Sequence, residues 1–432
     1  MSVIRKYCVF ICVIVGCNLL LTGCRQEEAL EKQHIEVSGF EENTQLSEYI
    51  YLFNESQDEY EVEFTLLEYS EDAFTKLMID MVGGKGPDLV SWGKIYNKTL
   101  TASDVFLDLS AYMDDRIGTK DEYASNILNA FQTSDELKVL VASYKVSSMA
   151  LLAGDLAKID NWNIDALMEY YMQREDDTVF FMGETKSQVL AYLLGASLDS
   201  FIDWEAQSTS FDSDSFQKLL AFCNEFPSAL EFDDSISIRN MYLQGDILMY
   251  PLKMSSVFDV TTTKALFGGE NVAFMGYPTE DGSALVCEPM DQVFSVNSQC
   301  ESIEGVYDFL DGILSYEYQS NMESGYPVLN TVLEESLEAA MESTYDSEGN
   351  QVVKDQVRFE GEEAENIYQI TQSDADELVE LLGEVVTSSF TDLELMQIIY
   401  EEADAYFHGD KTVEDVTETI KNRADLYIKE KY

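Results

Sequence analysis

Strand and helix patterns alternate between residues 35 and 92, and this alternation constrains the fold more than any other feature of the chain. Apolar side chains recur at every second residue over 62–66 and fill a short run at 88–92, as in buried strands. Residues 44–53 and 70–81 instead carry apolar side chains at helical spacing, each stretch after a capping Asn, Thr or Ser. This β-α-β-α-β order predicts a mainly parallel sheet with helices on its faces.

The rest of the chain carries mostly helical patterns. Apolar side chains have helical spacing in the stretches 166–173, 186–194, 215–226, 393–406 and 412–427. Thr391 and Glu394 predict a capping box at the start of one helix, with Phe390 and Leu395 packed beside it. Residues 293–296 read as a strand, and turn residues around Gly349 predict a hairpin at 345–353. With no internal repeat, the patterns favour a globular α/β protein of about two or three domains.

The first residues of the chain have the layout of a secretory signal peptide. Arg5 and Lys6 precede an apolar run at 7–23, which is shorter than the ~20 residues that a membrane-spanning helix needs. The run ends in Leu21-Thr22-Gly23-Cys24, which resembles a lipobox, the site where bacterial lipoproteins are cleaved and lipidated. The resemblance implies a signal peptide at 1–23, acyl chains such as palmitate on Cys24, and a polar tether at 24–34. An ordinary signal peptide with a chance cysteine is the alternative.

A lipid on Cys24 would hold the protein at the outer face of the cell membrane, as on a Gram-positive cell surface. The chain also carries a formal charge of −56, from 82 acidic and 26 basic residues. Such a charge repels nucleic acid and anionic lipid, so we expect no nucleic-acid partner and a membrane contact through the lipid alone. A solvated, soluble surface is the preferred explanation of the acidity. Recruitment of cations is the alternative, and no EF-hand spacing of carboxylates supports it.

Few residues are suited to metal binding or to nucleophilic catalysis. The chain has two histidines, His34 and His408, too few for a His-rich metal site and a poor start for a catalytic triad. Outside the signal peptide and Cys24, the cysteines are Cys223, Cys287 and Cys300, an odd number without CxxC spacing. One disulfide or three buried thiols are both consistent with this pattern. We therefore expect no metal, no cofactor and no catalytic residues.

Short motifs follow one another in a set order along the chain. They are Phe53-Asn54 with Tyr60-Glu61-Val62, Gly86-Pro87-Asp88-Leu89-Val90, residues 106–113, residues 201–204 with Phe211-Asp212, residues 276–279, residues 315–319 with 325–328, and residues 401–427. In this order, and over nearly the whole chain after the lipobox, they resemble the extracellular solute-binding lipoproteins of bacterial ABC importers, family 1, the carbohydrate-type group. Residues 287–290 and 306–309 depart from the family pattern, and these departures leave the identity of the ligand open.

The resemblance implies a two-lobed, periplasmic-binding-protein-like (type II) α/β fold with a hinge and a ligand cleft between the lobes. The first lobe would comprise residues 35–140 and 279–325, and the second residues 145–274 and 328–432. The chain would cross between the lobes near 140–145, 274–278 and 324–328. The implied function is capture of a mono- or oligosaccharide by cleft closure, in a monomer that delivers the solute to an ABC permease.

A sugar site needs aromatic platforms for apolar C–H faces and side chains that hydrogen-bond hydroxyl groups. Trp92 and Tyr69 each end a predicted strand of the parallel sheet, where open α/β sheets present loops to ligands. Trp92 is the first candidate for a stacking residue, with a core role as the alternative. Glu42, in the loop after the first strand, is a candidate acceptor for hydroxyl groups. The further candidates for ligand contact are Tyr144, Trp204, Tyr250 and Glu288.

Two other classes of function remain open from the sequence. A receptor that reports its bound state to a membrane sensor, or a surface adhesin, would use the same cleft without transport. An extracellular glycosidase would use paired carboxylates, but the abundance of acidic residues makes chance pairs unavoidable. We expect a binding protein and not an enzyme.

Overall fold

The structure is a computed structural model of the chain. It describes residues 32–93, 96, 101, 103–117, 122–133, 135–174, 178–195, 197–204, 206–230, 237–269, 271–279, 282–290, 292–358, 363–388 and 392–431. The predicted signal peptide, Cys24, and Phe390 and Thr391 of the predicted capping box lie outside the described residues. Within these ranges, no helix combines the length and the apolarity that a bilayer crossing requires. Cys223, Cys287 and Cys300 are all free thiols.

The first sheet is built from the N-terminal alternation. Within the described residues its strand order is β2-β1-β3-β12-β4, with β1 (Gln33–Gly39), β2 (Tyr60–Leu66), β3 (Leu89–Ser91), β12 (Val293–Val296) and β4 (Leu140–Val141). β1 pairs in parallel with β2 and β3, whereas β12 is antiparallel to β3 and β4. The connections are α2 (Thr44–Ser56) and α3 (Glu71–Val82), so the predicted β-α-β-α-β unit is confirmed.

Local sequence explains where these two helices begin. The side chain of Asn43 accepts a hydrogen bond from Leu46 N over 2.8 Å, and Ser70 accepts one from Ala73 N over 3.2 Å. These contacts satisfy backbone donors that have no partner within the helix. Leu46, Ile50 and Phe53 then fall on one buried face of α2. As a result, the first turn of α2 is fixed directly after the carboxyl end of β1.

The second sheet is centred on the long strand β5 (Ser143–Leu152). Its other described strands are β8 (Met249–Met254), β9 (Val272–Met275), β10 (Tyr277–Pro278), β11 (Ser283–Pro289), β13 (Tyr326–Pro327) and β16 (Val385–Ser388). Successive side chains of β5 point to opposite faces. Val146 and Ala150 join the hydrophobic cluster that reaches the first sheet, and Met149 and Leu151 join a second cluster. Both faces of this sheet are therefore covered along most of β5.

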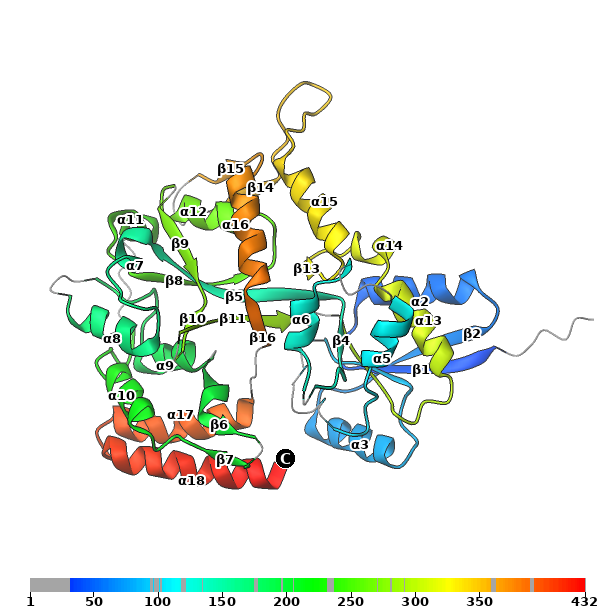
Figure 1. Cartoon of the computed structure of the whole chain (residues 1–432), viewed down its shortest axis with the longest axis horizontal. Helices are drawn as coiled ribbons and strands as arrows, with labels where there is room; N and C mark the ends of the chain where they lie inside the picture. The colour runs from blue at the N-terminus through cyan, green and yellow to red at the C-terminus, as the bar shows by residue number, and fades with distance from the viewer. Residues whose placement is uncertain are drawn as a thin grey trace, which may run out of the picture.

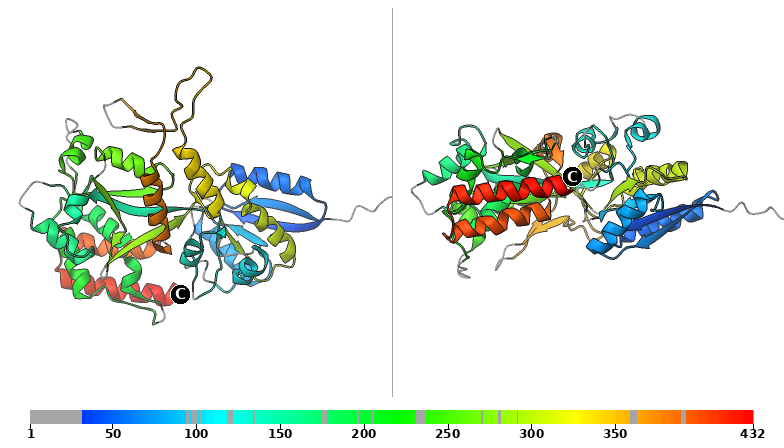
Figure 2. Two further views of the ribbon diagram at one scale, coloured as in Figure 1. Left: turned by 45° about the horizontal axis from the view of Figure 1, so that its top comes forward. Right: turned by 90° about the horizontal axis from the view of Figure 1, so that it is seen from below.

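Helices cover the two faces of the second sheet and complete each lobe (Figures 1 and 2). On the face of the second cluster lie α8 (Ile164–Met172), α9 (Lys186–Gly195), α10 (Asp214–Cys223), α17 (Leu393–Phe407) and α18 (Val413–Lys431). The other face carries α12 (Asp259–Leu266) and α16 (Gln372–Gly383). Figure 1 shows α17 and α18 side by side along one edge of this lobe, and the second view in Figure 2 agrees.

The remaining elements are short or connect the two lobes. They are α5 (Ser110–Tyr112), the π-helical turn Met113–Ile117, α6 (Ser125–Ala130), α7 (Ala153–Leu156), the 3₁₀ turn Leu198–Phe201, β6 (Ile202–Asp203), β7 (Ser208–Thr209), α11 (Ile238–Gln244), α13 (Ile303–Ile313), α14 (Tyr316–Gln319), α15 (Asn330–Met341), β14 (Asp355–Val357) and β15 (Glu365–Ile367). The loop after α15 projects from the molecule in Figure 1. An antiparallel bridge between Tyr345 and Gln351 confirms the hairpin predicted there.

Three segments cross between the sheets and lie side by side. Ala142 N donates to Gln292 O over 3.0 Å, and Val328 N donates to Ala142 O over 3.2 Å. The crossing predicted near 274–278 is wrong, because β11 stays in the second sheet, paired with β5 and β16, before the chain leaves it. The passage falls between Pro289 and Val293, so residues 283–289 belong to the second sheet and not to the first lobe. Elsewhere the chain passes from β4 to β5 at Ala142, and β13 begins at Tyr326.

Candidate ligand-binding site

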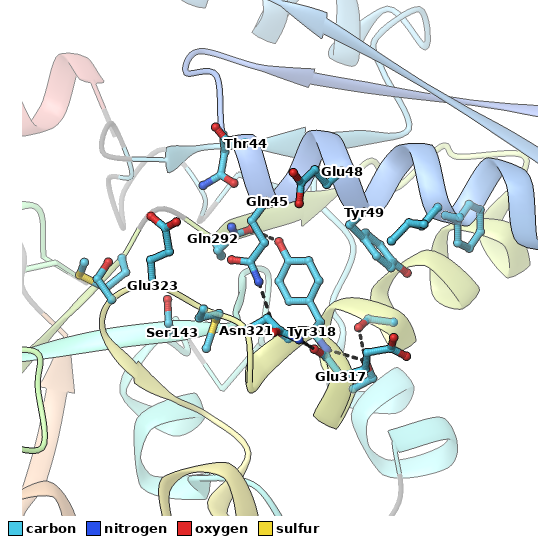
Figure 3. Close-up of a pocket in the computed structure, with 18 of the residues that line it drawn as sticks. Thr44, Gln45, Glu48, Tyr49, Ser143, Gln292, Glu317, Tyr318, Asn321 and Glu323 are labelled. Carbon is cyan, nitrogen blue, oxygen red and sulfur yellow. Dashed lines mark hydrogen bonds between the residues drawn. The ribbon is translucent and has the colours of Figure 1, made fainter. Parts of the chain in front are cut away.

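A cavity of about 900 Å³ lies where the first turns of α2 and the short helix α14 meet the crossings (Figure 3). Its wall is amphipathic. The polar lining residues include Asn43, Thr44, Gln45, Ser143, Gln292, Ser315 and Asn321, the acidic ones are Glu41, Glu42, Glu48, Glu317 and Glu323, and the large apolar or aromatic ones are Tyr49, Leu52, Phe53, Met290, Tyr318 and Met322. The cavity therefore sits at the junction of the two sheets, beside the chain segments that connect them.

Tyr318 joins three elements of the cavity wall. Its hydroxyl donates a hydrogen bond to Gln292 Oε1 over 2.8 Å, and its backbone oxygen accepts one from Gln45 Nε2 over 3.0 Å. Burial raises the pKa of the Tyr318 hydroxyl well above its ordinary value, so the group stays a neutral donor. These bonds link α2, α14 and the second crossing, and Figure 3 shows the three side chains converging.

Two polar groups at the crossings face the cavity without a protein partner. Ser143 is 2 % exposed and Gln292 is 4 % exposed, and both line the cavity. Within the described residues, neither Ser143 Oγ nor Gln292 Nε2 has a hydrogen-bond partner. Neither atom is among the fully enclosed side-chain atoms that lack a partner, so both remain accessible from the cavity. A hydroxyl and an amide N–H are therefore free to bind a solute at the floor of the cavity.

Aromatic and aliphatic side chains form the apolar part of the wall. The rings of Tyr49 and Tyr318 meet edge to face with centroids 5.2 Å apart, and Tyr49 Oη donates to Phe309 O over 2.8 Å. Leu52 remains largely exposed beside them. Apolar surface next to unpartnered polar groups suits a solute that has both hydroxyl groups and C–H faces.

The structure places only one sequence-predicted ligand residue, Glu42, in the cavity wall. Trp92 is completely buried, donates from Nε1 to Ser295 Oγ over 2.8 Å, and packs on Phe40 and Phe106. Trp92 therefore packs in the hydrophobic core, the alternative to a stacking role, because an enclosed indole has no free face for a sugar. Tyr69 follows β2 and is 72 % exposed, outside the cavity.

The other four candidates lie on the second lobe or at its edge. Tyr144 is buried at the first crossing against Tyr326, and Tyr250 packs edge to face on Tyr242. Trp204 is half-buried and donates to Asp199 Oδ1 over 2.8 Å. Glu288 forms ion pairs with Lys145 at 3.1 Å and Lys253 at 2.8 Å. None of the four lines the cavity, and their roles in ligand contact stay predictions.

Sequence reasoning missed most of the cavity, including Gln45, Ser143, Gln292, Tyr318 and Asn321. Ser143 and Gln292 flank crossings, and Gln45 lies two residues after Asn43, the capping residue of α2. Their positions next to these elements are the sequence signal that could have identified them as site residues. In the described part of the chain, no group of three or more His, Cys, Asp and Glu side chains is arranged to hold a metal ion.

The two lobes, their alternating elements and the three crossings define the fold of periplasmic solute-binding proteins, as the sequence predicts. Two solved structures that share it are the cyclic α-maltosyl-1,6-maltose binding protein of Arthrobacter globiformis and a family 1 extracellular solute-binding protein of Alicyclobacillus acidocaldarius. The first is 13 % identical at a TM-score of 0.53, with 93 % of this chain and 100 % of that chain covered. The second is 13 % identical at a TM-score of 0.54, with 92 % and 99 % covered.

A de novo designed cysteine esterase also shares the fold, at 12 % identity and a TM-score of 0.57 over 92 % of this chain and 98 % of that one. No protein-family model matches the sequence, and no curated protein matches it significantly. At such low identity the likeness establishes the fold alone. Function must therefore be argued from the site.

Proposed function

We propose that this protein is an extracytoplasmic solute-binding protein that captures a saccharide in the cavity and delivers it to an ABC permease. The observation that carries the proposal is the pair of unpartnered groups, Ser143 Oγ and Gln292 Nε2, in a cavity of about 900 Å³ at the lobe junction. Ligand sites in proteins of more than one lobe form preferentially at such interfaces. Binding, and not catalysis, is the proposed activity.

The chemistry of the wall supports a saccharide as the solute. Tyr49 and Tyr318 provide aromatic surface for C–H faces, and Gln45, Gln292 and Asn321 are amides of the kind that bind hydroxyl groups. The protein from Arthrobacter globiformis that shares the fold is named for binding a cyclic maltosyl-maltose. Both observations favour a hydroxyl-rich ligand of mono- to oligosaccharide size.

The crossings support capture by closure of the two lobes. The chain passes between the sheets at Ala142, between Pro289 and Val293, and near Gly325, and backbone hydrogen bonds hold these segments together. A few residues at element ends are the usual hinges of such movements. In our proposal the closed form docks on the permease as a monomer, and lipid on Cys24 holds the protein at the outer face of the membrane.

The experiment is a thermal melt of the full-length protein, purified in mild detergent, with a panel of mono- and oligosaccharides. A ligand at about 100 times its Kd adds about 2.7 kcal/mol to the stability of the folded state, enough to raise the Tm by a few degrees. We expect one class of sugar to raise the Tm, and Gln292→Leu to abolish that shift. Gln356→Leu, an exposed change on β14 away from the cavity, serves as the matched control. A cooperative melt that no sugar shifts would refute saccharide binding.

Transport is separated from sensing by a second measurement. Addition of the saturated protein to vesicles that contain its candidate ABC permease should stimulate ATP hydrolysis and sugar uptake. Stimulation of a sensor kinase, with no uptake by the permease, would instead support a receptor with the same binding fold.

A further inference from the structure

The solvent-exposed part of the cavity wall, here called the mouth, is acidic. Glu41 and Glu42 precede α2, Glu48 lies on α2, and Glu317 and Glu323 come from α14 and the loop after it. All of these carboxylates are exposed except Glu41, which is half-buried. The lining residues that the structure describes include no Lys, Arg or His. The local potential at the mouth is therefore negative.

Local carboxylates matter more here than the net charge of the whole chain. At physiological ionic strength the potential of a charge falls off over about 8 Å, so most of the −56 charge is screened from any one site. Among the lining residues that the structure describes, the five glutamates are the charged ones. The charged side chains that the structure describes along the cavity wall are thus all of one sign.

The basic side chains on the second sheet near the crossings are already paired. Lys145 Nζ lies 3.1 Å from Glu288 Oε2, and Lys253 Nζ contacts both carboxylate oxygens of Glu288, at 2.8 Å and 3.0 Å. Neither lysine lines the cavity. They therefore do not act as a phosphate or carboxylate anchor inside the site, and an anionic solute meets no described cation in the wall.

The nearly buried part of the same cavity wall, here called the floor, is uncharged and polar. Ser143 Oγ and Gln292 Nε2 are neutral, belong to nearly buried side chains, and have no described hydrogen-bond partner. Figure 3 shows Ser143 and Gln292 on the crossing side of the cavity, with Glu48 and Glu323 also at its wall. The site thus combines a neutral, hydroxyl-binding floor with an anionic mouth.

We propose that the solute is an amine-bearing saccharide, whose hydroxyl groups meet the floor at Ser143 and Gln292 and whose protonated amine meets the carboxylates at the mouth. This inference rests on the proposed saccharide-binding function and narrows its substrate class. Each solvent-exposed ion pair is weak, and several act together here. Their sum corresponds to a preference of about tenfold for the amine-bearing sugar over its neutral counterpart.

The test is isothermal titration of the full-length protein with three probes of equal chain length, at a mildly acidic pH that keeps amines protonated. The probes are a glucosamine oligosaccharide, its N-acetylated neutral form, and a glucuronic acid oligosaccharide. We expect the glucosamine probe to bind about tenfold tighter than the neutral one, and the glucuronate probe to bind weakest. Because salt screens exposed charges, the preference should shrink between about 20 mM and about 500 mM salt.

Variants locate the effect at the mouth. Glu42→Gln combined with Glu323→Gln should reduce the preference for the glucosamine probe over the neutral probe several-fold. Glu380→Gln, an exposed change on α16 outside the cavity, should leave the preference intact. Equal or tighter binding of the neutral probe by the unmodified protein would overturn the charge preference while saccharide binding stands. Binding of no saccharide of any charge would refute saccharide binding itself.

Discussion

The hydroxyl of Tyr318 donates a hydrogen bond of 2.8 Å to Gln292 Oε1, and this bond connects the wall of the cavity to a crossing between the sheets. Tyr318 lies on α14 in the first lobe, and Gln292 lies directly before β12, where the chain returns from the second sheet. Gln292 also lines the cavity, and its Nε2 has no hydrogen-bond partner among the described residues. A solute that binds this amide would therefore contact a residue at a crossing between the two sheets.

Tyr318→Phe removes this bond and leaves Gln292 Oε1 buried without its donor. We expect the free energy of unfolding to fall by about 1–3 kcal/mol, which is the typical cost of an unsatisfied buried polar group. Sugar affinity should fall as well, because the Gln292 amide loses its fixed orientation. Urea denaturation and titration calorimetry measure the two effects. Tyr51→Phe on the exposed side of α2 is the control, and equal losses in the two variants would contradict the role of the bond.

Gly325 is required at the third crossing for steric reasons. Its φ of +85° is unfavourable for other residues, and a Cβ there would lie 2.6 Å from Met290 Cγ and 3.2 Å from Tyr144 O. Gly325→Ala should cost about 1–3 kcal/mol of stability, and the displaced crossing should impair closure on sugar. Gly349 has the same φ of +85° with no atom within 4 Å, so Gly349→Ala isolates the cost of backbone strain. A Gly325→Ala variant no less stable than Gly349→Ala would show that the close contacts are irrelevant.

Substitution of Trp92 distinguishes a role in the hydrophobic core from a role in ligand binding. Trp92→Phe keeps most of the packing but removes the hydrogen bond to Ser295 Oγ, so stability should fall by about 1–3 kcal/mol. Sugar affinity of the folded variant should stay within about twofold of the parent. Tyr69→Ala, at a side chain that is 72 % exposed, should leave stability within about 0.5 kcal/mol. A large loss of affinity in Trp92→Phe without a loss of stability would restore the stacking hypothesis.

The elements of the first lobe could be predicted because their signals are local. Asn43 and Ser70 cap their helices through neighbouring backbone groups, and apolar spacing alone indicates which face is buried. The crossing between the second and first sheets could not be placed in this way. Tyr277-Pro278 resembles a boundary, but β11 continues the second sheet through pairing with β5, about 140 residues earlier in the chain.

The candidate site was the least predictable part, because it too depends on contacts between segments that are distant in the sequence. Trp92 stands at the end of a parallel strand, where ligands often bind, yet Phe40, Phe74 and Phe106 enclose it. The cavity instead depends on Gln45, Ser143, Gln292 and Tyr318 from four distant segments. Their meeting is set by sheet topology and by the hydrogen bonds among the crossings, which leave no local trace in the sequence.

Glu184 gives the protein a pH-dependent stability that has no link to the cavity. Burial raises the pKa of this carboxyl from 4.5 to about 7, while its Oε2 accepts a hydrogen bond from Phe180 N over 2.6 Å. Below pH 4.5 the group is protonated in both the folded and the unfolded state, so it has no effect. Between pH 4.5 and about 7 the unfolded state ionises more readily, and Glu184 therefore destabilises the fold progressively as the pH rises.

Glu184→Gln removes this penalty and keeps an oxygen that accepts from Phe180 N. We expect the variant and the parent to be similar at about pH 4, and the variant to be more stable by about 2 kcal/mol at about pH 8, after allowance for partial solvent screening. Urea denaturation at the two pH values measures the difference. Glu225→Gln, at a nearby exposed position, should show no such divergence. A stability gain that is the same at both pH values would mean that the Glu184 carboxyl does not titrate in this range.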